Sequence, residues 1–182
     1  AYNTAIGYNT GTAMTTGINN TLIGGNAGMS ILGANDNVCI GTYSGDALTT
    51  GVRNVAIGAY SLSSEDGDGY NVAIGHTALL NQNAGASAYN TAVGYSAGST
   101  ISTGIYNTLV GGQAGDALTT GSYNTVLGYN ALGAEDGNGK NVAIGHEALK
   151  VQNAGADAKN VAIGYVAGQA ISTGIRNTFM GG

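Results

Sequence analysis

The chain has 182 residues, with 33 glycines, no proline, one cysteine and a formal net charge of −5. An apolar content of 43% is too high for a disordered chain, whereas a charged content of 8% lies far below the roughly 25% of an ordinary domain. Nucleic acid and anionic membrane surfaces are therefore poor partners, and no apolar run approaches the ~18 residues that span a bilayer.

A five-residue motif, Asn-(Thr or Val)-x-aliphatic-Gly, organises the whole sequence. Its first residues are Asn3, Asn20, Asn37, Asn54, Asn71, Asn90, Asn107, Asn124, Asn141, Asn160 and Asn177. Successive motifs are 17 residues apart in eight intervals and 19 apart in the other two. A fixed period of this size is typical of a solenoid. We interpret residues 1–182 as one repeat array, excised from a longer fibre, with a 70-residue super-repeat at 37–106 and 107–176.

Each motif predicts a short β-strand that follows its asparagine, because its variable positions are β-branched or aliphatic. The fourth motif position is expected to be buried inside the coil. It is occupied by Ile6, Ile23, Ile40, Ile57, Ile74, Val93, Val110, Leu127, Ile144, Ile163 and Met180. The middle position of the strand is apolar too, so the strand should be covered on both faces. One thin coil has a single interior, and we therefore expect a parallel homotrimer whose middle positions face the axis or a neighbouring chain.

The second half of each repeat predicts another short strand, for example at residues 14–16, 48–50 and 118–120, followed by a glycine turn. Two strands and two turns in each repeat give an all-β parallel β-solenoid of about eleven rungs. In-register stacking should place the eleven asparagines in one column, where their amides can form a hydrogen-bonded ladder. A ligand-binding role for that column is the less favoured alternative.

The motif Asn-Val-Ala-Ile-Gly, with an Ala-Gly pair three to four residues beyond its glycine, resembles the head repeats of YadA-like trimeric autotransporter adhesins. Residues 2–8 and 120–125 are more similar still to the Asn-Thr-Ala-Ile-Gly-Tyr and Thr-Thr-Gly repeats of phage tail-fibre proteins. The resemblance covers the whole chain, and it implies a left-handed β-roll with three chains around one axis. It further implies a non-enzymatic fibre segment, extracellular or on a virion, that presents a receptor-binding surface to a cell-surface glycan or protein.

Acidic turns and two-residue insertions mark the candidate contact loops at residues 65–69, 81–88, 135–139 and 151–158, which we expect to be exposed. Asn83 and Asn153 are their candidate contact residues. The acidic turns also contain weak candidates for calcium ligands, namely Glu65, Asp66, Asp68, Glu135 and Asp136. Exposed, solvated loops are the favoured interpretation of these turns.

The residue before each motif asparagine forms a further column, in which Tyr70, Tyr89, Tyr106 and Tyr123 are candidate contact residues. Aromatic packing between rungs is the alternative interpretation of these tyrosines. His76 and His146 are too far apart in a rod to share a metal ion, and Cys39 is interpreted as a small core residue.

We expect neither a cofactor nor a catalytic activity. The six-residue aliphatic period of hexapeptide acyltransferases fails after Ile6, Ile23 and Ile57, and no catalytic constellation is evident. An autotransporter adhesin head and an ice-binding solenoid remain alternatives to a tail fibre, the latter because some rungs carry Thr-Thr-Gly.

Overall fold

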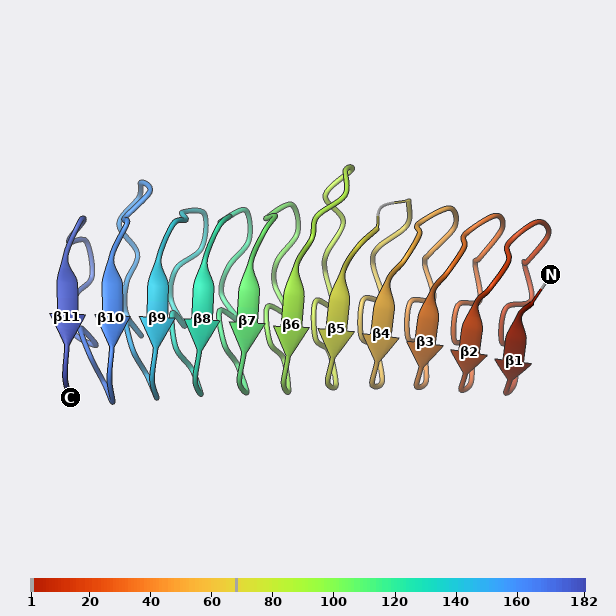
Figure 1. Cartoon of the computed structure of the whole chain (residues 1–182), viewed down its shortest axis with the longest axis horizontal. Coiled ribbons are helices and arrows are strands. Elements are labelled where there is room, and N and C mark those ends of the chain that lie inside the picture. The colour runs from red at the N-terminus through yellow and green to blue at the C-terminus, as the bar shows by residue number, and fades with distance from the viewer. Residues whose placement is uncertain (1, 68) are drawn as a thin grey trace.

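A computed structural model describes residues 2–67 and 69–182. These residues form a β-solenoid whose eleven strands make one parallel sheet in chain order, with each rung of the rod contributing one strand (Figure 1). The strands are β1 (Thr4–Ile6), β2 (Thr21–Ile23), β3 (Val38–Ile40), β4 (Val55–Ile57), β5 (Val72–Ile74), β6 (Thr91–Val93), β7 (Thr108–Val110), β8 (Thr125–Leu127), β9 (Val142–Ile144), β10 (Val161–Ile163) and β11 (Thr178–Met180). The predicted all-β parallel solenoid is therefore confirmed.

Each motif strand pairs with the next one residue for residue, so the register does not shift along the strand direction. Ala56 pairs with Ala73 and Ile57 pairs with Ile74, and the same register holds across the 19-residue rung, where Ile74 pairs with Val93. The two extra residues of that rung must therefore be accommodated outside the sheet. Within the described ranges, no helix has the length and apolar character that crossing a bilayer requires.

The glycine that ends each strand permits this close stacking. Gly75 has a φ of +139°, and a Cβ built on it would lie 2.2 Å from the carbonyl oxygen of Gly94 in the next rung. Gly58 and Gly145 are in the same situation, with Cβ positions 2.5 and 2.1 Å from the next carbonyl oxygen. Only glycine adopts such a φ readily, and only glycine leaves room for the neighbouring backbone.

Within residues 2–67 and 69–182, the expected second strand of each rung does not form. Residues 15–16 and 49–50 are bends, and several of their N–H groups converge on a single carbonyl of the next rung. Thr15, Thr16 and Gly17 all donate to the carbonyl oxygen of Leu32, at 3.0, 3.0 and 3.2 Å. Because hydrogen bonds that converge on one acceptor replace the regular alternation of a ladder, this half of the rung is linked to its neighbour without being a strand.

The strand faces are the reverse of the predicted ones. The middle position points into the coil, where Leu22, Cys39, Ala73 and Leu109 have no exposed surface. The predicted core residues lie on the outer face instead. The following are half-buried or exposed in the single chain: Ile6, Ile23, Ile40, Ile57, Ile74, Val93, Val110, Leu127, Ile144, Ile163 and Met180. Successive strand residues point to opposite faces, so placing the middle position inside puts its two neighbours outside.

In most rungs the half that follows the strand contributes one large apolar side chain to the interior, from one of two positions. In some rungs a glycine such as Gly45 is followed three residues later by a buried Leu48, whose side chain lies against that glycine. In others the glycine is replaced by a buried leucine such as Leu62, and the later position becomes Glu65. The leucine fills the space that opens when the later side chain turns polar, so the interior remains closely packed.

The two insertions form loops that project beyond the other turns on the same side of the rod, one after β5 and one after β9 (Figure 1). Asn83 and Asn153 are exposed in these loops, and their N–H groups donate to the carbonyl oxygens of Ser102 and Ser172 at 2.7 Å. The loops are not exposed throughout, because Gln82 and Gln152 are fully buried beneath them.

Candidate functional site

The asparagine column is a continuous ladder through the rod. In each of ten steps, the backbone N–H of one motif asparagine donates to Oδ1 of the asparagine one rung earlier, at 2.8–3.1 Å. The Nδ2 groups of Asn37 and Asn107 donate within their own rungs to the carbonyl oxygens of Gly51 and Gly121, at 2.8 and 2.9 Å. Asn37, Asn54 and Asn71 have no exposed surface, so a ligand cannot reach this part of the column.

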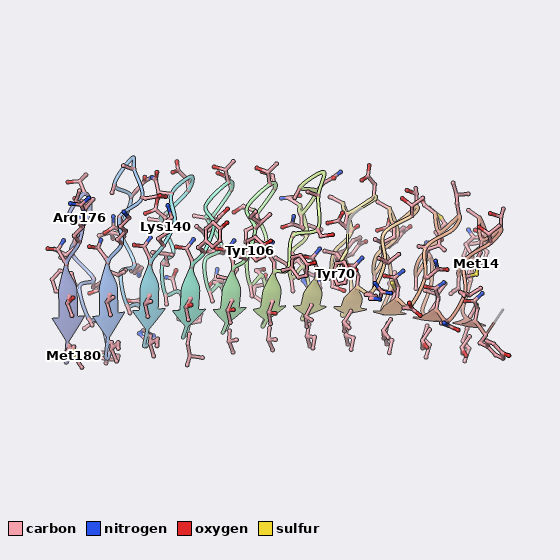
Figure 2. All side chains as sticks on the ribbon, turned by 45° about the horizontal axis from the view of Figure 1, so that its top comes forward. Met14, Tyr70, Tyr106, Lys140, Arg176 and Met180 are labelled. Atoms are coloured by element: carbon pink, nitrogen blue, oxygen red, sulfur yellow. The ribbon has the colours of Figure 1, made fainter. Side chains whose placement is uncertain are left out.

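The column immediately before the asparagines is exposed and aromatic. Tyr70, Tyr89, Tyr106 and Tyr123 stack in sequence, with ring centroids 4.9, 5.5 and 5.3 Å apart and interplanar angles of 18° or less. The predicted aromatic packing between rungs is therefore present, and the ring edges of Tyr89, Tyr106 and Tyr123 stay in solvent. In Figure 2, Tyr70, Tyr106, Lys140 and Arg176 follow one another along the rod beside the start of the strands.

Cations extend the tyrosine stack in both directions. The Arg53 guanidinium lies 5.5 Å from the centroid of the Tyr70 ring, and its Nη1 donates to the Tyr70 hydroxyl at 2.7 Å. Beyond Tyr123, the same column continues with Lys140, Lys159 and Arg176. All three are exposed, and Lys140 forms an ion pair with Asp157.

A second aromatic column follows the strands, and its residues were not among those predicted from the sequence. His146 stacks between Tyr129 and Tyr165, with centroid distances of 5.5 and 5.3 Å. His76 stacks on Tyr95 at 5.7 Å in the earlier super-repeat. Aligning the residue directly after each motif glycine would have found these rings, because several rungs carry Tyr or His at that position.

The histidines and the acidic turns do not form a metal site among the described residues, where no group of three potential ligands gathers. Asp66 and Asp136 are exposed, and their carbonyl oxygens instead accept N–H bonds from Thr49 and Thr119 at 2.6 and 2.5 Å. The calcium candidate Asp68 lies outside the described residues.

Glu65 and Glu135 correct the expectation of solvated loops, since both are fully buried. Asn71 Nδ2 donates to Glu65 Oε2 at 3.3 Å, and Asn138 Nδ2 donates to Glu135 Oε1 at 2.9 Å. Burial raises the pKa of Glu135 above its usual value, although the hydrogen bond from Asn138 opposes that shift. These carboxyl groups face the coil interior, which explains why they do not form a calcium site on the surface.

Four buried polar atoms have no hydrogen-bond partner within the described ranges, and all lie in or beside these polar interior positions. They are Gln82 Nε2, Glu135 Oε2, Asn141 Nδ2 and Gln152 Nε2. The set includes both an acceptor and donors, so small side-chain rotations or a buried water molecule could satisfy it. The polar interior thus extends over the two 19-residue rungs, which hold Gln82 and Gln152, and the 17-residue rungs before them, which hold Glu65 and Glu135.

Cys39 faces the coil interior, as expected for a small core residue, and burial raises the pKa of its thiol to about 12. The thiolate is the reactive form of cysteine, so this group is inert at neutral pH.

The outer face of the sheet is an uncharged surface that runs along all eleven strands. Both outward strand positions carry only Thr, Val, Ile, Leu or Met in all eleven rungs, and none carries a charge. Ile6, Leu127 and Met180 are 59%, 47% and 77% exposed. The face therefore combines regular geometry with unburied aliphatic side chains, as protein–protein interfaces do.

Comparison of this chain with models of protein families, with curated proteins and with solved structures gives no match.

Proposed function

We propose that this chain is a segment of a non-enzymatic adhesive fibre, a tail-fibre shaft or head that assembles as a parallel homotrimer and carries a receptor-binding surface. The observation that supports it most directly is the uncharged outer face of the sheet, which runs the whole length of the rod. A rod with such a face is best covered by a partner with a matching face of equal length. Another copy of the same chain provides that face.

The energetics favour association through this face. Each outward aliphatic side chain that is covered contributes at about 25 cal/mol per Å² of apolar area removed from water. The gain is repeated in every rung, whereas the rotational and translational entropy of association is lost only once for each chain. Since neither outward strand position is charged, assembly brings no like charges together on this face. The interface thus consists of the first and third strand positions, and the middle position is satisfied within the coil.

Threefold closure suits a fibre. Three copies around an axis parallel to the rod bury one face of each and leave the loops and the aromatic columns toward the outside or the seams. A closed ring of subunits also prevents lateral growth into larger aggregates. The projecting loops after β5 and β9 would then recur around the fibre.

Sedimentation equilibrium of the full chain tests the assembly. We expect the mass of three chains at micromolar concentration, and the mass of one chain would contradict the proposal. The double variant Ile57→Glu/Ile144→Glu places charges on the outer face and should give single chains. The matched variant Ser64→Glu/Lys150→Glu introduces charges away from this face and should remain trimeric.

The adhesive part is tested by binding of the fluorescently labelled trimer to a panel of intact bacterial cells. We expect saturable binding to at least one surface. A trimer that binds none of the surfaces would leave a purely structural shaft and overturn the receptor-binding part of the proposal.

A further inference from the structure

Four of the five lysine and arginine residues of this acidic chain lie in a single column. We define the tyrosine–cation column as the residues that precede successive motif asparagines along most of the rod. They are Arg53, Tyr70, Tyr89, Tyr106, Tyr123, Lys140, Lys159 and Arg176. We propose that the tyrosine–cation column binds a linear acidic polysaccharide that lies along the rod. This inference rests on the proposed adhesive function and assigns its ligand class and site.

The backbone of this column has a left-handed conformation that large side chains adopt at a cost. Tyr70, Tyr123 and Lys140 have φ values of +66°, +62° and +65°, a left-handed conformation that glycine and asparagine adopt at lower cost. The same column holds Asn19 and Asp36 in earlier rungs, where the conformation is also left-handed. Large, mostly exposed side chains thus occupy this column although smaller residues would adopt its backbone more easily.

The stacking decides which ligand chemistry can be recognised. Each inner tyrosine ring is covered on both faces by its neighbours, while Tyr89, Tyr106 and Tyr123 remain 46%, 45% and 55% exposed. A ligand can therefore reach ring edges and hydroxyl groups but not the inner ring faces. Single-stranded nucleic acids bind by stacking bases on a row of open aromatic faces, which the inner tyrosines of this column lack. A row of hydroxyl groups instead matches the hydroxyl and ring oxygens of a sugar chain.

The repeat along the rod favours an extended polymer over a compact ligand. The tyrosines recur once in each rung, about 4.8 Å apart as in any parallel ladder, and their ring centroids keep this spacing at 4.9–5.5 Å. That spacing is close to the length of one sugar unit in an extended chain. Successive units can then meet equivalent hydroxyl groups in successive rungs.

The cations indicate that the polymer is acidic. Arg53 forms an ion pair with Asp36, with Nε 3.8 Å from Oδ2, and Lys140 forms an ion pair with Asp157. Lys159 and Arg176 form no salt bridge with any described residue. Both side chains can therefore donate charge-assisted hydrogen bonds, which are the strong ones, to a carboxylate from outside the chain. A polymer of uronic acids offers hydroxyl groups to the tyrosines and carboxylates to these cations.

The test measures binding of the full chain to polygalacturonate, with the neutral polymer dextran as its counterpart. We expect saturable binding to polygalacturonate that weakens as salt is raised, and no binding to dextran. The variant Lys159→Gln/Arg176→Gln should bind at least tenfold more weakly, since two charged contacts are lost. The variant Tyr89→Phe/Tyr106→Phe keeps the stack but removes two hydroxyls, and it should bind several-fold more weakly.

Lys150 provides the matched control, because it is a cation outside the column and is paired with Glu147. Lys150→Gln should bind polygalacturonate as the parent does. Equal loss in Lys150→Gln and in the column variants would mean non-specific attraction and would overturn the inference, as would unchanged binding in the column variants.

Sedimentation of the same variants separates this inference from the fibre proposal. Column variants that lose polymer binding but keep the trimer mass support the inference. Column variants that fall apart into single chains would assign the column to the subunit interface and overturn it. A trimeric parent that fails to bind polygalacturonate overturns the inference alone, whereas a monomeric parent contradicts the fibre proposal.

Discussion

Leu48 and Glu65 occupy equivalent interior positions of neighbouring rungs, and both are fully buried. The leucine lies against Gly45, and in the next rung Leu62 takes the place of that glycine. Leu62 therefore supplies the large apolar side chain in a rung where the position of Leu48 holds the buried carboxyl group of Glu65. The relationship recurs in the second super-repeat, where Leu132 accompanies the buried Glu135.

Neighbouring residues of one strand should respond differently to a charge. Ala73→Asp places an unpaired carboxylate inside the coil, and we expect the free energy of unfolding to fall by about 3 kcal/mol or more. Ile74→Asp changes an outward residue, so the circular dichroism of the β-solenoid should persist while the proposed trimer dissociates. Denaturant unfolding followed by circular dichroism measures the first effect, and sedimentation measures the second. If Ile74→Asp unfolds the rung and Ala73→Asp does not, the assignment of the strand faces is wrong.

Glycines at two kinds of turn should differ in their tolerance of alanine. Gly75→Ala forces a Cβ to within 2.2 Å of the Gly94 carbonyl oxygen, at a φ of +139° that alanine rarely adopts. We expect it to cost about 3 kcal/mol or more. Gly85→Ala has a φ of +67° and no atom within 4 Å of the new Cβ, so it should cost only about 1 kcal/mol. Equal unfolding midpoints for the two variants would contradict the close backbone stacking.

Asn107→Ala tests the ladder. It removes the acceptor of the Asn124 N–H, at 2.9 Å, and the donor to the Gly121 carbonyl oxygen, at 2.9 Å. Two buried backbone groups would be left without partners, and we expect a loss of roughly 2–4 kcal/mol in unfolding free energy. The exposed loop residue Asn153 is the control, because Asn153→Ala should change stability by less than about 0.5 kcal/mol. A small effect at Asn107 would mean that water replaces the ladder.

Glu135 should make stability depend on pH. Its pKa is raised by burial, so the folded chain retains this proton over a pH range in which the unfolded chain has released it. Stability linked to this group is therefore greatest below the ordinary pKa of 4.5 and falls as pH rises through the raised folded value. Glu135→Gln should remove this decline and stabilise the chain at neutral pH. Unfolding midpoints between pH 4 and pH 7 measure it, and a parallel decline in both proteins would contradict this origin.

Much of the architecture followed from the sequence because stacked rungs translate a linear period directly into space. The 17-residue period predicted the parallel solenoid, the motif located all eleven strands, and the insertions after residue 74 and residue 144 located the two projecting loops. The asparagines needed only an in-register stack to form their ladder. These features depend on which residues are equivalent, and equivalence can be read from a repeat.

Only the tertiary structure decided which side of each strand faces the coil. Strand residues alternate between two faces, and when Ala73 and Ile74 are both apolar the pattern alone cannot choose between them. The narrow coil admits one small middle residue in most rungs together with one leucine or isoleucine from the opposite half. The two flanking residues must then lie outside. The burial of Glu65 and Glu135 was decided in the same way, because their positions face the coil interior although the residues there are acidic.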